Sequence, residues 1–193
     1  VEITVEQAKG RVPIIAGAGS NDTAKAVALS KEMKAAGATH LLHVSPMYNK
    51  PPQRGIIEHF KRIADATDLP IVVYNVPGRT GSNIEAKTTL ALAELPHVVA
   101  VKEASGNLAQ VTDILRDRPA EFAVLSGDDE MTLAMLAAGG DGVISVVSNA
   151  TPKAMARLCD AAAAGDYAAA RALHLQLLPW MRAAFVESNP IPV

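Results

Sequence analysis

A lysine ends one of the most apolar segments of the chain. Lys102 directly follows Val98-Val99-Ala100-Val101, so we expect it to project from the end of a core strand. Because an ammonium ion is costly to bury, burial lowers the pKa of a lysine and leaves a neutral amine that can attack a carbonyl carbon. The pattern therefore indicates Schiff-base chemistry at Lys102. The structural alternative is a lysine that forms an ion pair with Glu103 or another neighbour, and position alone favours neither.

A tyrosine stands at the equivalent position of the preceding apolar run. Tyr74 follows Ile71-Val72-Val73, and matching registers would bring its side chain about 5 Å from Lys102. A phenol beside an amine can relay protons while a carbinolamine forms and loses water. The alternative is a core tyrosine whose hydroxyl reaches the rim.

Arg79 lies in the turn that follows Tyr74, between proline and glycine residues that would fix its backbone. Its guanidinium suits a substrate carboxylate, although a surface arginine is the usual interpretation of such a residue.

The remaining reactive side chains do not indicate a metal or an organic cofactor. Asp128 and Asp129 follow a strand, where capping of the next helix is the preferred interpretation over metal binding. Cys159 lies in a helical segment and is expected to pack in the core. The histidines lack metal-ligand spacing and are interpreted as structural or solvent-facing; they are His40, His43, His59, His97 and His174.

Short apolar runs, each followed by a helical pattern, position these side chains. Near-continuous apolar runs are typical of parallel strands buried on both faces, and they cover 12–16, 40–44, 70–76, 98–104, 121–126 and 142–147. Helices are predicted between them and after the last, over 23–36, 55–66, 84–95, 108–116, 130–138, 152–164 and 167–186. The N-terminal residues look like the end of a further helix that stops at Lys9-Gly10. Caps are expected at Asn21 or Asp22, Asn107 and Asp129, and helix stops at Gly37 and Gly139.

Two architectures contain six consecutive strand–helix units. One is a (β/α)8 (TIM) barrel that here lacks its first two strands, and the other is a doubly wound open sheet. The open sheet would favour a GxGxxG loop after the first strand, but Asp22 stands where the third glycine is needed. We therefore expect an α/β barrel, with residues 1–150 forming strands 3 to 8. Residues 151–193 would form the last barrel helix and the start of a C-terminal helical region.

Composition excludes several functional classes. The chain has 193 residues, 49% of them hydrophobic, and a net charge of −2, so there is no electrostatic reason to expect nucleic acid or an anionic membrane as a partner. Neither a membrane-spanning run nor a signal peptide is recognisable, and the single cysteine fits a reducing compartment. We expect a cytoplasmic protein. Because the sequence starts without Met and stops at Pro192-Val193 without a helix end, we also expect a partial chain.

The ordered motifs resemble the dihydrodipicolinate synthase / N-acetylneuraminate lyase family. The segment Tyr74-Asn75-Val76-Pro77-Gly78-Arg79-Thr80-Gly81 and the later Lys102-Glu103-Ala104 carry the resemblance. Supporting segments span the chain and lie at 10–17, 46–51, 125–129, 142–146 and 187–192. The arginine in the tyrosine loop is similar to that of the dihydrodipicolinate synthase branch rather than to the sialic acid lyases.

The resemblance implies a Schiff-base condensation of pyruvate with aspartate 4-semialdehyde, in lysine and diaminopimelate biosynthesis, without a cofactor or metal. Lys102 corresponds to the Schiff-base lysine and Tyr74 to the proton-relay tyrosine. Arg79 corresponds to the arginine that receives the aldehyde substrate's carboxylate. Tyr48 corresponds to a tyrosine that reaches into a neighbouring subunit, which implies a homo-oligomer, either a dimer or a dimer of dimers. The backbones of Gly127 and Ile144 correspond to the lining of the pyruvate pocket.

Two departures and two alternatives accompany this interpretation. The family's first two strands, with a Gly-Thr-Thr-Gly-Glu segment, are expected before Val1. The lysine effector site of inhibited members uses an asparagine, an acidic residue and a tyrosine. The aligned residues here are Asn21, Lys25 and Met47, which predicts weak or absent inhibition by lysine.

One alternative function is that of another pyruvate-dependent aldolase or lyase that acts on a sugar acid or a sialic acid. The other is a catalytically silent barrel subunit.

Overall fold

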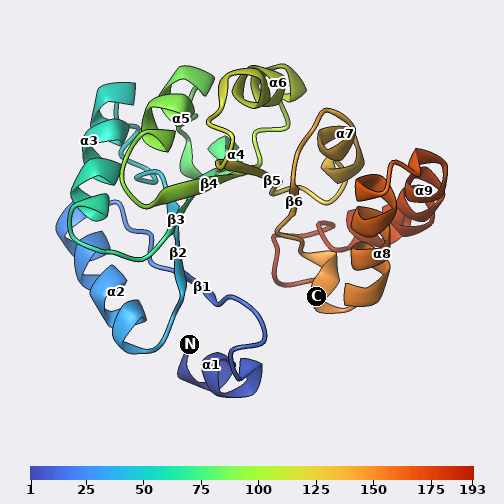
Figure 1. Cartoon of the computed structure of the whole chain (residues 1–193), viewed down its shortest axis with the longest axis horizontal. Helices are drawn as coiled ribbons and strands as arrows, with labels where there is room; N and C mark the ends of the chain where they lie inside the picture. The colour runs from blue at the N-terminus through green and yellow to red at the C-terminus, as the bar shows by residue number, and fades with distance from the viewer. The chain divides into compact units, whose positions relative to one another are not determined.

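Strands and helices alternate along the chain in the computed structural model, which describes residues 1–193 (Figure 1). The strands are β1 (Ile15–Gly17), β2 (His40–Val44), β3 (Ile71–Asn75), β4 (Val98–Glu103), β5 (Ala123–Ser126) and β6 (Gly142–Val143). The helices are α1 (Glu2–Ala8), α2 (Thr23–Ala35), α3 (Gln53–Ala64), α4 (Pro77–Thr80), α5 (Ala86–Ala93), α6 (Leu108–Asp117), α7 (Thr132–Ala137), α8 (Pro152–Ala163) and α9 (Tyr167–Ala183), with a 3-10 helix η1 (Val147–Asn149). Every predicted strand–helix unit is therefore present.

The six strands form one sheet in chain order, from β1 to β6. Pairing is parallel between β1 and β2, between β2 and β3, and between β5 and β6. Because parallel neighbours need a crossover between them, each connection carries at least one helix. The prediction of an α/β fold with a parallel sheet is confirmed.

Two strand boundaries differ from the prediction by three residues or more. β1 begins at Ile15 rather than Val12, whose side chain is exposed. β6 ends at Val143 rather than Val147. The Asp129 carboxylate accepts hydrogen bonds from the backbone N–H groups of Val146 and Val147, at 3.0 and 3.1 Å. These amides are therefore withdrawn from strand pairing, and the chain turns into η1.

The same aspartate corrects the predicted cap of α7. This helix starts at Thr132 after an N-cap residue, Met131, that makes no side-chain cap bond, so the prediction of Asp129 as N-cap was wrong. The other caps are confirmed: Asp22 accepts from the amides of Ala24 and Lys25, and Asn107 accepts from the amide of Gln110. Gly37 and Gly139, after α2 and α7, have φ angles of 90° and 105°, which only glycine adopts without strain.

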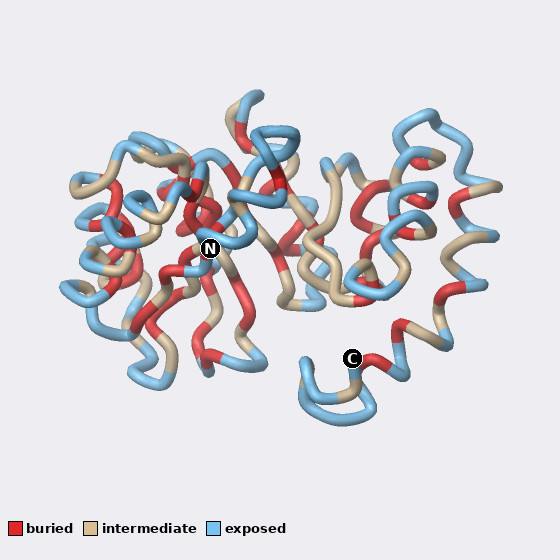
Figure 2. The backbone as a smooth tube through the Cα atoms, turned by 90° about the horizontal axis from the view of Figure 1, so that it is seen from below, coloured by how far each residue is buried: buried red, intermediate tan, exposed pale blue.

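The contacts divide the chain into two compact units, which we call unit 1 (residues 1–101 and 116–123) and unit 2 (residues 102–115 and 124–193). In unit 1, α2, α3 and α5 pack in succession along β1 to β3. Buried positions follow the strands and the inner sides of these helices, while their outer sides are exposed (Figure 2). The core of unit 1 includes Leu41, Ile56, Phe60, Ile71 and Leu92, all fully buried.

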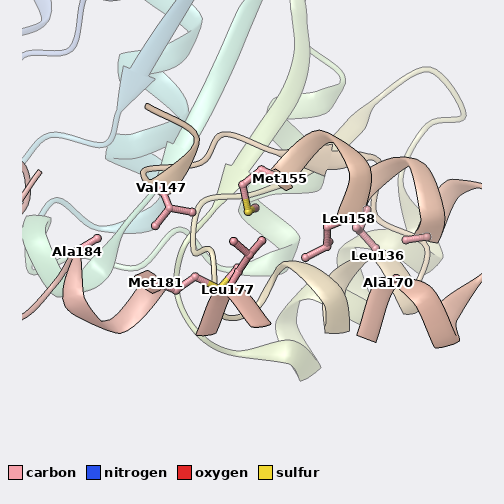
Figure 3. Packing of buried hydrophobic residues seen from close by; sticks show 9 residues of the cluster. Leu136, Val147, Met155, Leu158, Ala170, Leu177, Met181 and Ala184 are labelled. Atoms are coloured by element: carbon pink, nitrogen blue, oxygen red, sulfur yellow. The ribbon is translucent and has the colours of Figure 1, made fainter. Parts of the chain in front are cut away.

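Unit 2 has a hydrophobic core of its own, made mainly by α7, α8 and α9. Met155 and Leu158 of α8 lie toward Leu177 and Met181 of α9, with Leu136 of α7 beside them (Figure 3). The apolar spacing and the alanines of α8 and α9 allow the two helices to pack closely. None of the helices in either unit combines the length and apolar character needed to cross a membrane.

Candidate active site

Lys102 and Gly127 lie against each other in unit 2. Gly127 follows β5 directly, and its N–H donates to the carbonyl oxygen of Glu103 at 2.8 Å. A Cβ atom built on Gly127 would lie 3.0 Å from Cε and 3.1 Å from Cγ of Lys102, and 2.8 Å from Cβ of Ala104. Such contacts are too short for any side chain at this position, so the absence of a Cβ is what gives Lys102 its room.

Glu103 holds the turn that follows the lysine. Its side chain is almost fully buried, at 1% exposure. Oε1 accepts from the amide of Ser105 at 2.7 Å, and Oε2 accepts from the side-chain amide of Gln110 on α6 at 3.1 Å. Successive residues of a strand point to opposite faces, so Glu103 anchors β4 to α6 on the face opposite Lys102. The sequence suggested only an ion-pair role for it.

The backbone of Ile144 lies beside the end of β5. Its N–H donates to the carbonyl oxygen of Ser126 at 2.9 Å, one residue before Gly127. Asp129 then holds the two amides that follow, at Val146 and Val147. Unit 2 thus brings together Lys102, Gly127 and the segment that begins at Ile144, three of the predicted site residues.

Tyr74 and Arg79 are neighbours in unit 1. Tyr74 lies on β3 opposite Val44 of β2 and is half-buried. Burial raises the pKa of the Tyr74 hydroxyl, and the positive charge of Arg79 opposes this by lowering the pKa. The guanidinium of Arg79 and the phenol of Tyr74 therefore interact electrostatically, across the end of β3 and the short helix that follows it.

Arg79 belongs to the short helix α4, which β3 leads into. Its side chain is exposed, and the turn ends at Gly81 with a φ of 73°. Two amide side chains, of Asn75 and Gln53, bind the residues that leave this loop. Sequence reasoning named Asn75 only as part of the motif at 74–81 and did not name Gln53; the place of Asn75 beside a turn rich in proline and glycine was the only available signal.

Tyr48 is held in an unusual backbone conformation. Its φ is 70°, in the left-handed region that bulky residues rarely occupy, and its N–H donates to the carbonyl oxygen of Thr80 at 3.0 Å. The side chain is 88% exposed. The loop after β2 is therefore tied to the Arg79 loop while it presents an aromatic ring to the outside of unit 1.

No three histidine, cysteine, aspartate or glutamate side chains of the chain are grouped so that they could hold a metal ion. The chemistry that the described residues can support is that of an amine, a phenol and a guanidinium. An amine and a phenol suffice to form and break an imine, and a guanidinium suffices to bind a carboxylate.

Comparison with known proteins places these residues in a family. The model described as the Dihydrodipicolinate synthetase family matches residues 1–193. The chain is similar to the 4-hydroxy-tetrahydrodipicolinate synthases of Maridesulfovibrio salexigens, with 53% identity over 100% of this chain and 66% of that protein, and of Koribacter versatilis, with 54% identity over 98% and 64%. It is also similar to the crystal structure of a chloride-inhibited dihydrodipicolinate synthase from Acinetobacter baumannii complexed with pyruvate, at 42% identity and a TM-score of 0.96 over 99% of this chain and 66% of that one. The chain thus spans slightly less than two thirds of the length of the curated relatives that it matches.

Proposed function

The chain belongs to the dihydrodipicolinate synthetase family, and from that premise we propose that it carries the site of a 4-hydroxy-tetrahydrodipicolinate synthase. The reaction is a lyase-type condensation of pyruvate with aspartate 4-semialdehyde, in lysine and diaminopimelate biosynthesis. The names of the curated relatives support this function over a sugar-acid or sialic acid lyase and over a silent subunit. The observation that carries the proposal is the contact between the Lys102 side chain and the Cβ-free surface of Gly127.

Lys102 acts on pyruvate. Its neutral amine adds to the ketone carbon, and loss of water from the carbinolamine gives an imine. The imine withdraws electrons from the neighbouring methyl group, so a methyl proton leaves and an enamine forms. Tyr74 relays protons during these steps, since a tyrosine hydroxyl can both donate and accept a hydrogen bond.

The second substrate is bound through its carboxylate and attacked at its aldehyde. Arg79 offers a planar set of donors to that carboxylate. The enamine carbon bonds to the aldehyde carbon, and the aldehyde oxygen takes up a proton. The amine of the second substrate then adds to the imine carbon and expels Lys102, which closes the ring and restores the free lysine.

We further propose how the rest of the chain surrounds the site. Strands β1 to β6 correspond to strands 3 to 8 of a (β/α)8 barrel, with residues 1–150 in the barrel and 151–193 in its last helix and the C-terminal helical region. Gly127 and Ile144 line the pyruvate pocket with their backbones. Tyr48 enters the site of a second copy, in a dimer or a dimer of dimers, and its exposure and left-handed backbone support such a contact.

Borohydride trapping tests this function in the full-length protein that contains the chain. The protein is incubated with pyruvate and reduced, and the modified peptide is located by mass spectrometry. We expect a pyruvyl adduct on Lys102 that disappears in Lys102→Ala and persists in Lys153→Ala, a control that removes an exposed lysine of the same unit. A folded wild-type protein without an adduct would rule out the Schiff-base reaction.

A further inference from the structure

The loop that carries Arg79 is closed at its base by a side chain of β3. Asn75 is the last residue of that strand and is fully buried. Its Oδ1 accepts from the N–H of Ile84 at 2.9 Å, and its Nδ2 donates to the carbonyl oxygen of Ile84 at 3.3 Å. The side-chain amide thus pairs with both backbone groups of one residue, as a neighbouring strand would. Because Ile84 supplies one donor and one acceptor, the orientation of the Asn75 amide is fixed.

Further hydrogen bonds continue from the same amide. Nδ2 of Asn75 also donates to Oδ1 of Asn83 at 2.9 Å. From α3, Nε2 of Gln53 donates to the carbonyl oxygen of Asn83 at 2.9 Å, and its Oε1 accepts from the N–H of Glu85 at 3.2 Å. The residues that leave the loop, 83 to 85, are therefore held by two amide side chains from two different elements.

The interior of the loop is rigid for a different reason. Thr80 Oγ1 donates to the carbonyl oxygen of Ser82 at 2.8 Å, and the N–H of Arg79 donates to the carbonyl oxygen of Val76 at 2.9 Å. Ile84 itself is fully buried. The turn around Arg79 is therefore expected to move as one rigid piece, and only when the hydrogen bonds between Asn75 and Ile84 at its base break.

We propose that Asn75 is a positioning residue for the second substrate: its side-chain amide holds Ile84 and thereby sets where the Arg79 guanidinium meets the carboxylate of the aldehyde. This inference rests on the proposed function and adds to it a residue that touches neither substrate. Asn75 acts through Arg79 on the aldehyde substrate and leaves the reaction of Lys102 with pyruvate unchanged. Gln53 has the same effect to a smaller degree, because it is only partly buried and binds the outer end of the loop.

The test is a steady-state comparison of Asn75→Ala, Arg79→Ala and their double variant in the full-length enzyme. We expect Asn75→Ala to raise the KM for the aldehyde about tenfold, with the KM for pyruvate and the borohydride-trapped fraction within about twofold of wild type. Since Asn75 acts through Arg79, the double variant should match Arg79→Ala rather than add the two effects. Ser30→Ala is the matched control, since Ser30 is also fully buried and hydrogen-bonded in unit 1 but lies away from the loop.

Each unfavourable result has a distinct meaning. An equal rise in the KM of both substrates, or additive effects in the double variant, would overturn the positioning role. If borohydride traps no pyruvate adduct on the wild-type enzyme, the proposed function itself is contradicted. If Asn75→Ala does not fold, Gln53→Ala decides, with an expected rise of about threefold in the KM for the aldehyde alone; an unchanged KM there overturns the inference.

Discussion

The two units hold their site residues in different ways. In unit 2, Lys102 and Gly127 meet because neighbouring strand ends are joined by the backbone, through the bond from Gly127 N–H to the Glu103 carbonyl oxygen. In unit 1, Arg79 lies beyond β3, in a loop that is held by amide side chains. Backbone pairing fixes where the two strand ends lie, whereas the shape of a loop held by two side chains changes when one of them is replaced. We therefore expect substitutions of residues that touch neither substrate to change the binding of the aldehyde more than the activation of pyruvate.

The largest effect is expected at the reactive amine. Lys102→Ala removes the only protein atom that bonds to pyruvate in the proposed reaction, so turnover should fall at least about a thousandfold. Steady-state assays give the turnover, and a thermal melt shows whether the fold survives, which we expect because no core packing depends on the amine. Activity within about tenfold of wild type would mean that another residue is the nucleophile and that unit 2 does not activate pyruvate through Lys102.

A smaller but still large effect is expected from a single methyl group at Gly127. Gly127→Ala places a Cβ within 3.0 Å of Lys102 Cε and 2.8 Å of Ala104 Cβ, which displaces the lysine. Turnover should fall by about ten- to a hundredfold, with reduced trapping of pyruvate. Gly142→Ala is the control in the same unit, because its added Cβ would meet Leu125 at an ordinary 3.5 Å. Equal effects of both substitutions would mean that the loss is general to the sheet and not specific to Lys102.

The sequence predicted which side chains lie at strand ends, but it did not predict hydrogen bonds between residues that are distant in the sequence. Lys102 and Tyr74 directly follow apolar runs, so their elements could be predicted from local pattern alone. Asp129 was expected to cap the helix next to it, but its carboxylate binds amides 17 and 18 residues away, a choice that only tertiary packing decides. Asn75 could be named only as part of a motif, because its partner, Ile84, is recognisable only once the loop has folded back.

The buried histidines of unit 1 should make its stability depend on pH. Ser30 Oγ donates to the carbonyl oxygen of Ala26 at 2.7 Å, so it accepts from Nε2–H of His43 at 3.1 Å. Burial, with a smaller contribution from the nearby His59, lowers the pKa of His43 from 6.5 to about 4. Burial also lowers the pKa of His59. Both rings therefore resist protonation only while unit 1 is folded.

Acid should destabilise unit 1 in a defined pH range. Because the folded-state pKa of His43 lies below its unfolded value, its contribution to stability is complete above about pH 6.5 and is lost as the pH falls toward about 4. The loss at pH 5 should be on the order of 2 kcal/mol. Hydrogen exchange at neutral and acidic pH measures it, and β2 and α3 should lose more protection than α8 and α9. His43→Gln, which keeps an N–H for Ser30, should reduce this difference in protection between the two units. His97→Gln, at an exposed site, should leave the difference unchanged. An equal loss of protection in both units would contradict an origin in the protonation of His43.

The smallest effect is expected from added lysine. The side-chain amide of Asn49 donates to the backbone oxygen of Asn21 at 3.1 Å, so the segment with Asn21 and Lys25 lies beside the loop with Met47. The Lys25 ammonium would repel an effector's amine, and Met47 offers no hydroxyl. Lysine at about 1 mM should therefore leave the turnover of the full-length enzyme within about 20% of its value. The double variant Lys25→Glu, Met47→Tyr replaces repulsion by attraction and should increase inhibition, whereas strong inhibition of the wild type at low lysine concentration would show that the effector binds without these two residues.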